Sequence, residues 1–351
     1  FFFFAFPFAM GGDTMMKSAQ LHGAMKSGIT EFTMDELREN VRVDEVNRPR
    51  PRSGQVLLRI ERAVINPMDM SFLKASYGRD NHKPFPYGLG SEGIGRVVES
   101  NSLLGYPMVG KRVAFFKYNA AWAEYVCVPV TSVMVIGEAS SYESEHDGVS
   151  SFVNPLTCLA FVEIALAAKA KAVVATASGS ALGQMLIRHG ARNGIKVISV
   201  VRSERSAKVC RDTGAAEVVI SEDKDFHAKL TKACADLGAT ICFDAVSGSL
   251  AGTVLNAMPN GSTMYVYGGL SEDRPTISTR DLIFKRKTMT GFWLKDYVEE
   301  HKWNIGLLLW SRTVSTYLSS DFKTEVVKSF PLSKIQEAIH YYSRNMGAGK
   351  V

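Results

Sequence analysis

Apolar, β-branched runs alternate with helix-forming stretches from about residue 152 onward, and this alternation constrains the fold more than any other feature of the chain. The runs recur at a spacing of 20 to 30 residues. They span residues 172–175, 196–201, 217–220, 241–245 and 263–267, with a sixth run at 288–294 after a longer connection. Near-continuous apolar strands separated by amphipathic helices are typical of a parallel sheet covered on both faces. This half of the chain is therefore predicted to be a doubly wound α/β domain of the nucleotide-binding type.

The preceding half has a different texture of short, turn-punctuated, β-rich runs. They cover residues 55–60, 93–98, 112–116 and 124–128, and Gly or Pro bounds nearly every one. This pattern predicts a small, irregular barrel or sandwich. A length of 351 residues agrees with about two domains.

Composition excludes several functions. Lys and Arg number 41 against 35 Asp and Glu, and the surplus is spread along the chain, so no nucleic-acid footprint is indicated. The five cysteines contain no C-x-x-C pair, which argues against a disulfide framework and favours a reducing compartment. The Phe-rich start, residues 1–8, is far shorter than the ~20 residues of a membrane span and has no preceding basic residue. We predict no membrane partner and set residues 1–15 aside.

The first strand of the doubly wound half runs into Ser178, Gly179, Ser180, Ala181, Leu182 and Gly183, and a helix follows. This is a degenerate glycine fingerprint. A tight strand-to-helix turn lets backbone N–H groups approach a pyrophosphate, the helix N-terminus adds partial positive charge, and Gly183 permits close helix packing. The alternative is an ordinary turn of small residues, which the repeated β-α context makes less favourable.

The end of the second strand predicts the choice of cofactor. An NAD site usually places Asp or Glu there, whereas this chain has Arg202, Ser203, Glu204 and Arg205. Guanidinium groups suit a phosphate dianion, so we predict NADPH over NADH. The alternative is that Glu204 holds the ribose and the arginines are solvated.

A catalytic zinc site is not predicted. No Cys precedes Cys127, Ser91 stands where an imidazole ligand would be needed, and the four closely spaced cysteines of a structural zinc lobe are missing. Without a Lewis acid, hydride transfer needs an acceptor activated by conjugation, or a quinone.

Several segments together resemble the zinc-free medium-chain dehydrogenase/reductases: Ile-Asn-Pro-Met-Asp at 65–69, Gly-Leu-Gly-Ser-Glu-Gly at 88–93, Val-Asn-Pro-Leu-Thr at 153–157 and Tyr-Gly-Gly at 267–269. Within that family, the chain is most similar to mitochondrial-type trans-2-enoyl-thioester reductases. Three stretches carry this narrower resemblance: residues 76–78, residues 154–157, and residues 282–285 followed by 291–294. The resemblance covers roughly residues 50 to 350. It implies a GroES-like β-rich catalytic domain (16–149 and 296–351) and a Rossmann NADP-binding domain (150–295).

The resemblance also implies roles for individual residues. Tyr77 would be the catalytic hydroxyl, although it also fits a packed loop aromatic. The implied cofactor contacts are Asn154, Thr157, Gly179, Ser180, Ala181, Leu182, Gly183, Arg202, Ser203, Arg205, Tyr267, Gly268, Gly269, Leu270, Phe292, Trp293, Leu294 and Lys350. Phe292 and Trp293 also fit core aromatics of a sixth strand. Gly179 and Ala181 replace the family's usual Asn and Gly, and Glu204 stands where a second arginine is common.

Three functions remain open from the sequence. The first is NADPH-dependent reduction of an activated C=C bond, with a 2-enoyl thioester as the favoured substrate. The second is an NADPH:quinone oxidoreductase, and the third is a catalytically idle NADPH-binding protein. An exposed sixth-strand edge and the resemblance predict a homodimer. The nearest relatives imply the mitochondrial matrix, with the cytoplasm as the alternative.

Overall fold

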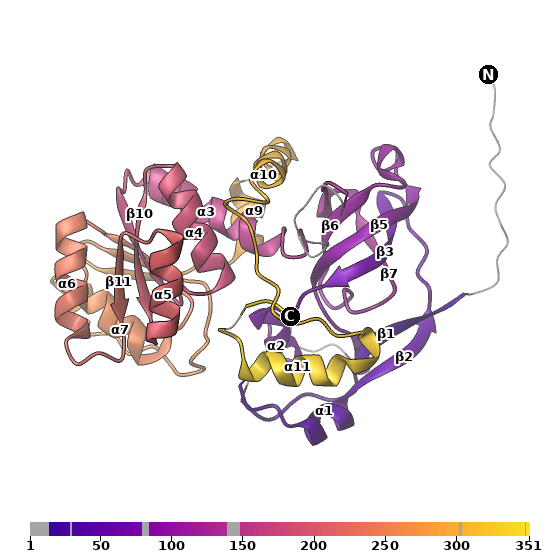
Figure 1. Cartoon of the computed structure of the whole chain (residues 1–351), viewed down its shortest axis with the longest axis horizontal. Coiled ribbons are helices and arrows are strands. Elements are labelled where there is room, and N and C mark those ends of the chain that lie inside the picture. The colour runs from indigo at the N-terminus through magenta and orange to yellow at the C-terminus, as the bar shows by residue number, and fades with distance from the viewer. Residues whose placement is uncertain (1–13, 29, 79–83, 139–147, 302–303, 348) are drawn as a thin grey trace.

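The computed structural model describes residues 14–28, 30–78, 84–138, 148–301, 304–347 and 349–351. The Phe-rich start lies outside these residues. The described chain forms two lobes joined side by side, with the parallel sheet in one and the antiparallel sheets in the other (Figure 1). No helix within the described ranges is long and apolar enough to cross a membrane.

The first lobe contains two sheets. A five-stranded antiparallel sheet has the order β7-β3-β5-β6-β8, and a three-stranded sheet has the order β2-β1-β4. Their strands are β1 (Met15–Leu21), β2 (Val41–Asn47), β3 (Gln55–Ala63), β4 (Tyr87–Gly88), β5 (Glu92–Asn101), β6 (Arg112–Phe116), β7 (Tyr125–Pro129) and β8 (Val133–Val135). The predicted β-rich runs are thus confirmed, and β1 begins one residue inside the segment that was set aside.

Two short helices belong to the same lobe, α1 (Met34–Asn40) and α2 (Pro67–Leu73). Helix α2 starts where Asn66 and Asp69 form a capping box and Pro67 occupies the first turn. The position of α2 matters for function, because the chain leaves its C-terminal end directly toward Tyr77.

The second lobe is a six-stranded parallel sheet in the order β11-β10-β9-β12-β13-β14. Its strands are β9 (Ala172–Thr176), β10 (Lys196–Val201), β11 (Glu217–Ile220), β12 (Ile241–Asp244), β13 (Thr263–Val266) and β14 (Thr288–Gly291). The helices of this lobe are α3 (Val153–Ala167), α4 (Ala181–Arg192), α5 (Glu204–Thr213), α6 (Phe226–Leu237), α7 (Gly248–Ala257) and α8 (Thr279–Ile283). The strand order reverses between β9 and β12, which defines the switch point where doubly wound sheets bind ligands.

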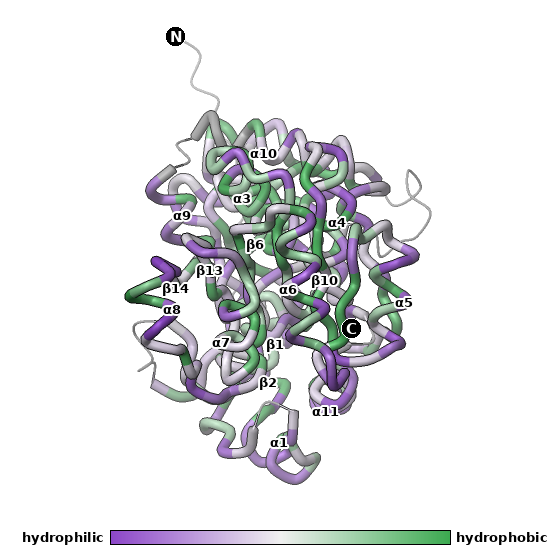
Figure 2. Tube along the Cα trace, turned by 90° about the vertical axis from the view of Figure 1, so that its left-hand side faces the viewer, coloured by the Kyte–Doolittle hydropathy of each residue, from purple (hydrophilic) through white to green (hydrophobic). Residues whose placement is uncertain are grey.

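Burial explains why the apolar runs form central strands. All five residues of β9 are buried, and helices on both faces cover the sheet. Figure 2 shows the same arrangement, with hydrophobic segments in the interior around α3 and the sheet and hydrophilic ones on outer helices such as α5 and α11. The predicted doubly wound fold is confirmed.

The C-terminal part crosses between the lobes. Helices α9 (Leu294–His301) and α10 (Asn304–Thr316) both pack against α3. Helix α11 (Ile335–Arg344) lies instead against α1 and β2 of the first lobe, at the bottom of Figure 1. The predicted domain boundary at residue 296 stays a prediction, since the return to the first lobe is completed only at α11.

Candidate active site

The turn from β9 into α4 has the geometry of an anion-binding helix N-terminus. Ala177 adopts a φ of 48°, and the Ser180 hydroxyl caps α4 by accepting the Gly183 N–H at 3.2 Å. A Cβ at Gly183 would collide with the backbone of Ser178, so only glycine lets the helix lie this close to the turn. The first-turn amides of α4 have no partners within the helix and lie at the switch point, where they suit a pyrophosphate.

A second helix N-terminus lies beside this turn. A Cβ added to Gly179 would stand 3.1 Å from that of Ser206 in the first turn of α5, so α5 begins against the turn. Ser203 caps α5 by accepting the Ser206 N–H at 3.4 Å, and exposed Arg202 directly precedes it. The predicted pyrophosphate and 2′-phosphate sites are therefore adjacent. Leu182 is buried, so only its backbone is available to a phosphate.

Glu204 is already engaged on its own helix. Arg211 donates to the Glu204 carboxylate at 2.5 Å, and this hydrogen bond holds the pKa of the carboxyl below its usual value. A ribose ligand at this position would have to compete with Arg211. The geometry therefore favours Arg202 and Ser203 over Glu204 as the groups that meet the cofactor's adenosine end.

Two polar residues that the sequence analysis missed tie the switch point together. Thr176, at the end of β9, donates its hydroxyl to Asp244, at the end of β12, at 2.6 Å. Asp244 is fully buried and also accepts the backbone N–H groups of Val246 and Ser247. The sequence did contain a signal for this pair, because each of the two apolar strands ends in a polar residue.

The predicted nicotinamide-side residues follow β13 and β14. Tyr267 donates its N–H to the carbonyl of Asp244 at 2.9 Å, and Gly268 lies so close to Ala245 that a Cβ would be 2.8 Å from its carbonyl oxygen. Phe161 packs its ring 5.0 Å from that of Tyr267 and 4.9 Å from that of Phe292. Tyr267 and Phe292 are therefore partly buried and pack against the core at the carboxyl edge of the sheet, and their contact with a nicotinamide stays a prediction.

Tyr77 lies between the lobes. Its hydroxyl accepts a hydrogen bond from Trp293 Nε1 at 3.2 Å, which joins the segment after α2 to the segment after β14. Its ring lies 4.6 Å from Phe72 and 5.8 Å from Tyr118. Burial raises the pKa of Tyr77, while the hydrogen bond from Trp293 acts in the opposite direction. Tyr77 is thus a neutral hydrogen-bond donor at pH 7, held against the cofactor lobe.

Tyr118 and Asn119 are the other residues that sequence reasoning missed. Tyr118 follows β6 and packs on Phe116, with ring centroids 4.7 Å apart. Asn119 has a φ of 58°, and both polar atoms of its side chain are buried without a hydrogen-bond partner among the described residues. No motif marks the Lys-Tyr-Asn sequence at 117–119; only the fold brings it to Tyr77.

Asn154 and Thr157 lie near the N-terminus of α3. Asn154 Nδ2 donates to the Ser150 hydroxyl at 3.3 Å, and the Thr157 hydroxyl donates to the Val153 carbonyl at 2.7 Å. Glu92, on β5 of the other lobe, accepts the backbone N–H groups at the start of the helix, at 2.7 and 2.9 Å. A buried carboxylate at a helix N-terminus is favourable, so Glu92 fixes α3 relative to the first lobe. Contact of Asn154 and Thr157 with a cofactor stays a prediction.

Lys350 belongs to a buried polar cluster. Its ammonium donates to Asn66 Oδ1, and Asn66 Nδ2 donates to Glu92 at 3.0 Å. Asp69 accepts from the Asn66 N–H at 2.8 Å and from Ser91 at 2.9 Å. Burial raises the pKa of Asp69 to about 7 and lowers the pKa of Lys350, while attraction between the ammonium and the two carboxylates opposes both shifts. Lys350 is thus an internal counter-ion, and its predicted contact with the cofactor stays a prediction.

The donor set does not suit a metal. No three His, Cys, Asp or Glu side chains converge on one point in the ranges that the structure describes. The polar centre of the first lobe combines Asn66, Ser91 and the Lys350 ammonium with two carboxylates, and an ammonium repels a cation. The expectation of a metal-free site stays a prediction.

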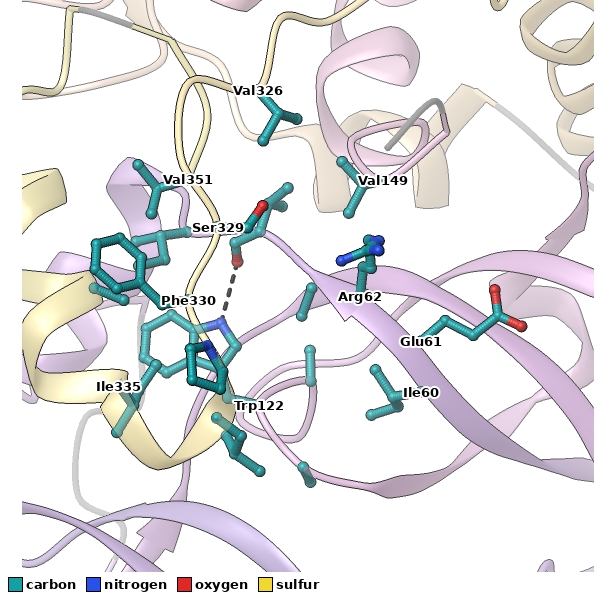
Figure 3. A pocket seen from close by; sticks show the side chains of 18 of the residues that line it. Ile60, Glu61, Arg62, Trp122, Val149, Val326, Ser329, Phe330, Ile335 and Val351 are labelled. Atoms are coloured by element: carbon teal, nitrogen blue, oxygen red, sulfur yellow. Dashed lines mark hydrogen bonds between the residues drawn. The ribbon is translucent and has the colours of Figure 1, made fainter. Parts of the chain in front are cut away.

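A cavity of about 260 Å³ lies elsewhere in the first lobe (Figure 3). Its wall joins the end of β3, the loop around Trp122 and the segment from Val326 to Ala338, and Trp122 donates its indole N–H to the Val64 carbonyl at 3.1 Å. None of the predicted site residues lines it. The chemistry is therefore assigned to the junction of the lobes rather than to this cavity.

Comparison with known proteins agrees with this architecture. Residues 52–138 match the alcohol dehydrogenase GroES-like domain, and residues 179–310 match the zinc-binding dehydrogenase family. The enoyl-[acyl-carrier-protein] reductase, mitochondrial, of Dictyostelium discoideum is 26% identical over 261 residues, covering 70% of this chain and 71% of that protein. The human protein of the same name is also 26% identical, covering 71% of this chain and 67% of its own length.

Solved structures extend the similarity. A putative NADPH:quinone reductase from Mesorhizobium loti has a TM-score of 0.81 and 30% identity, covering 96% of this chain and 97% of its own. The Etr1p/NADP/crotonyl-CoA complex has a TM-score of 0.73 at 17% identity, covering 96% of this chain and 98% of its own, which is a likeness of fold. A β-rich lobe joined to a doubly wound lobe defines a class of two-domain oxidoreductases. The chain belongs to the medium-chain dehydrogenase/reductase superfamily.

Proposed function

We propose that this protein is an NADPH-dependent reductase that transfers hydride to the activated C=C bond of an α,β-unsaturated carbonyl compound, with trans-2-enoyl thioesters as its substrate class. The observation that carries the proposal is the position of Tyr77. Its hydroxyl belongs to the first lobe, is held by Trp293 of the second lobe, and lies between them. A phenol in this place can donate to a carbonyl oxygen next to a nicotinamide.

The residues present fit NADPH. The close approach at Gly183 brings the α4 amides to a pyrophosphate, and Arg202 and Ser203 stand where a 2′-phosphate would lie. Arg205, in the first turn of α5, adds positive charge there. Gly269, Leu270 and Leu294 lie in the segments that follow β13 and β14, on the nicotinamide side of the same edge.

The chain's own groups supply binding, orientation and proton donation. NADPH, when bound, supplies the hydride. Negative charge then develops on the thioester carbonyl oxygen, and a donor placed there stabilises it by ~2.7–4 kcal/mol. Tyr77 is that donor, and it either stabilises the enolate or delivers the α-proton, directly or through water. Phe292 and Trp293 present an apolar wall to an acyl chain.

Quinone reduction is the second candidate, because the Mesorhizobium loti structure described as a putative NADPH:quinone reductase is 30% identical. The two reactions differ in what they need from Tyr77. Reduction of an enoyl thioester concentrates charge on one carbonyl oxygen and therefore depends on a single donor. A quinone distributes charge over a conjugated ring and depends on it less.

One panel of assays separates the candidates. NADPH oxidation is followed with crotonyl-CoA, with 2-hexenoyl-CoA, with a quinone and without acceptor, for the wild type and Tyr77→Phe. Turnover of enoyl thioesters that falls at least tenfold in the variant supports the proposal. Quinone turnover that ignores the substitution, or NADPH binding without any turnover, would replace it with a quinone reductase or an idle NADPH-binding protein.

We further propose a homodimer through the free edge of β14. Ile283 and Phe284, just before this strand, are 62% and 76% exposed, and an open strand edge beside apolar side chains favours pairing with a second copy. Sedimentation equilibrium tests this, with Phe284→Glu expected to shift the protein to monomer. The relatives named mitochondrial support the mitochondrial matrix as its location, with the cytoplasm as the alternative.

A further inference from the structure

Ser247, the N-cap residue of α7, has a backbone conformation that is normally confined to glycine. Its φ is 66° and its ψ is −151°. A residue with a Cβ is strained in this region, and the strain persists only where the surrounding structure imposes it. Strained residues of this kind gather at active sites and ligand-binding sites. The conformation of Ser247 therefore asks for an explanation in terms of function.

The turn before α7 explains the backbone conformation but not the serine. The carboxylate of Asp244 accepts the N–H groups of Val246 and Ser247 at 3.1 and 2.9 Å, and this pairing fixes the turn. Glycine would form the same turn without strain, as Gly248 does at the next position with a φ of 61°. Serine differs from glycine only in its side chain, so the side chain must contribute what offsets the strain.

That side chain is buried and has no partner within the described part of the chain. Ser247 is 7% exposed, its hydroxyl makes no capping hydrogen bond to α7, and no other described residue hydrogen-bonds to it. A buried hydroxyl without a partner is unfavourable, because it has lost its hydrogen bonds to water. The contribution of the Ser247 hydroxyl is therefore made to a ligand.

The position of Ser247 identifies the ligand. Thr176, the last residue of β9, donates its hydroxyl to Asp244 at 2.6 Å and accepts the Ala245 N–H at 2.9 Å. The turn after β12 is thus tied to the turn after β9, and ligands of doubly wound sheets bind where these turns meet. The negative charge of Asp244 disfavours a phosphate at Ser247, whereas a sugar hydroxyl is neutral and can both donate and accept. A ribose hydroxyl is the partner that fits.

We propose that the Ser247 hydroxyl forms a hydrogen bond with a ribose hydroxyl of the bound dinucleotide. The inference rests on the NADPH binding of the proposed function and adds a binding residue to it. The chain keeps a serine in a glycine conformation because this contact offsets the strain. Both NADPH and NADH carry free ribose hydroxyls, so Ser247 serves the two cofactors alike, in contrast to Arg202.

Two substitutions separate the hydroxyl from the strain. Ser247→Ala removes the hydroxyl and keeps the strained Cβ, whereas Ser247→Gly removes both. In fluorescence titrations, each variant should bind NADPH and NADH about fivefold more weakly, as expected for the loss of one neutral hydrogen bond. In thermal unfolding without cofactor, the Tm of Ser247→Gly should rise by about 2 °C or more, and the Tm of Ser247→Ala should stay near the wild-type value.

Lys169→Gly is the matched control. Lys169 also has a positive φ, of 55°, but it is exposed and precedes β9, so it lies at the opposite edge of the parallel sheet from Ser247. This substitution should raise the Tm and leave both dissociation constants unchanged.

Three results would overturn the inference: wild-type affinity for NADPH in both Ser247 variants, weakening that is confined to NADPH, or a Tm of Ser247→Gly no higher than that of the wild type. A wild-type protein that binds NADPH but does not reduce an enoyl thioester would instead overturn the proposed reductase function, and the role of Ser247 would stand.

Discussion

Lys350→Met is the substitution that tests the buried charge cluster most sharply. It removes an ammonium that lies within hydrogen-bonding reach of Asn66 and beside Asp69 and Glu92, which are 1% and 0% exposed. Methionine keeps much of the side-chain length. Removing one partner of a buried ion pair leaves an uncompensated charge and typically costs ~3–5 kcal/mol. We expect the free energy of unfolding to fall by about that amount at pH 8.

The loss should depend on pH in a defined direction. Burial raises the pKa of Asp69 from 3.8 to about 7. Between these values the native protein holds a proton that the unfolded chain has released, so a rise in pH through this window lowers stability. Removing Lys350 raises the pKa of Asp69 further, since the ammonium attracts the carboxylate. The extra destabilisation is therefore greatest above pH 7 and shrinks as the pH falls toward 4.

Urea unfolding followed by tryptophan fluorescence at pH 5 and pH 8 provides the measurement. Lys232→Met is the control, because Lys232 forms an exposed pair with Asp236, and such pairs contribute ~0–1 kcal/mol. A loss below ~1 kcal/mol at pH 8, as little as expected of an exposed pair, would refute the reasoning. Equal losses at both pH values would refute the assignment to the carboxylates.

Three further predictions follow from individual contacts. Arg202→Ala should weaken NADPH binding by tenfold or more, as measured by fluorescence titration, and leave NADH nearly unchanged; equal effects on both would contradict the choice of cofactor. Gly183→Val should abolish binding of both cofactors, because its side chain would collide with Ser178, and retained binding would remove the pyrophosphate turn from the site. Glu272→Gln breaks a 2.5 Å ion pair with Lys74 that joins the two lobes. Because both side chains are partly exposed, we expect the free energy of unfolding, measured by urea unfolding, to change by less than ~1 kcal/mol, and a larger change would contradict this.

The sequence predicted the parallel sheet well because its central strands, β9, β10 and β12, are buried between helices on both faces. The runs at 196–201 and 217–220 became β10 and β11 with the same bounds. A strand covered by helices on both sides needs apolar, β-branched residues at nearly every position, so the strand can be recognised from its own short stretch of sequence. Because Gly183 follows β9 and Arg202 follows β10, both could be predicted to lie at the carboxyl edge of the parallel sheet.

The polar cluster around Lys350 could not be predicted from the sequence, because its members are far apart along the chain. Its members come from α2, β5 and the C-terminal segment, and no spacing connects Asn66 with Lys350. The family resemblance suggested a cofactor contact for Lys350, which stays a prediction, and the structure adds that its ammonium is buried and donates to Asn66 Oδ1. Long-range pairing of this kind depends on how the tail returns to the first lobe.

Tyr118 was missed for the same reason. It stands after β6, an ordinary half-buried strand end, and nothing in its neighbours marks it as functional. Its closeness to Tyr77 arises because α2 delivers Tyr77 to the end of β6 and Trp293 closes the group from the other lobe. Residues that only the tertiary fold brings together leave little trace in a single sequence.

Transfer of isotope from cofactor to substrate tests the central claim most directly. The protein is incubated with NADPH carrying deuterium at the transferable C4 position and with 2-hexenoyl-CoA, and the product is examined by NMR. We predict one deuterium at the β-carbon of the saturated thioester, a proton from solvent at the α-carbon, and a rate of transfer that falls at least tenfold in Tyr77→Phe. An unlabelled thioester, or transfer that is equally fast without the Tyr77 hydroxyl, would contradict the account.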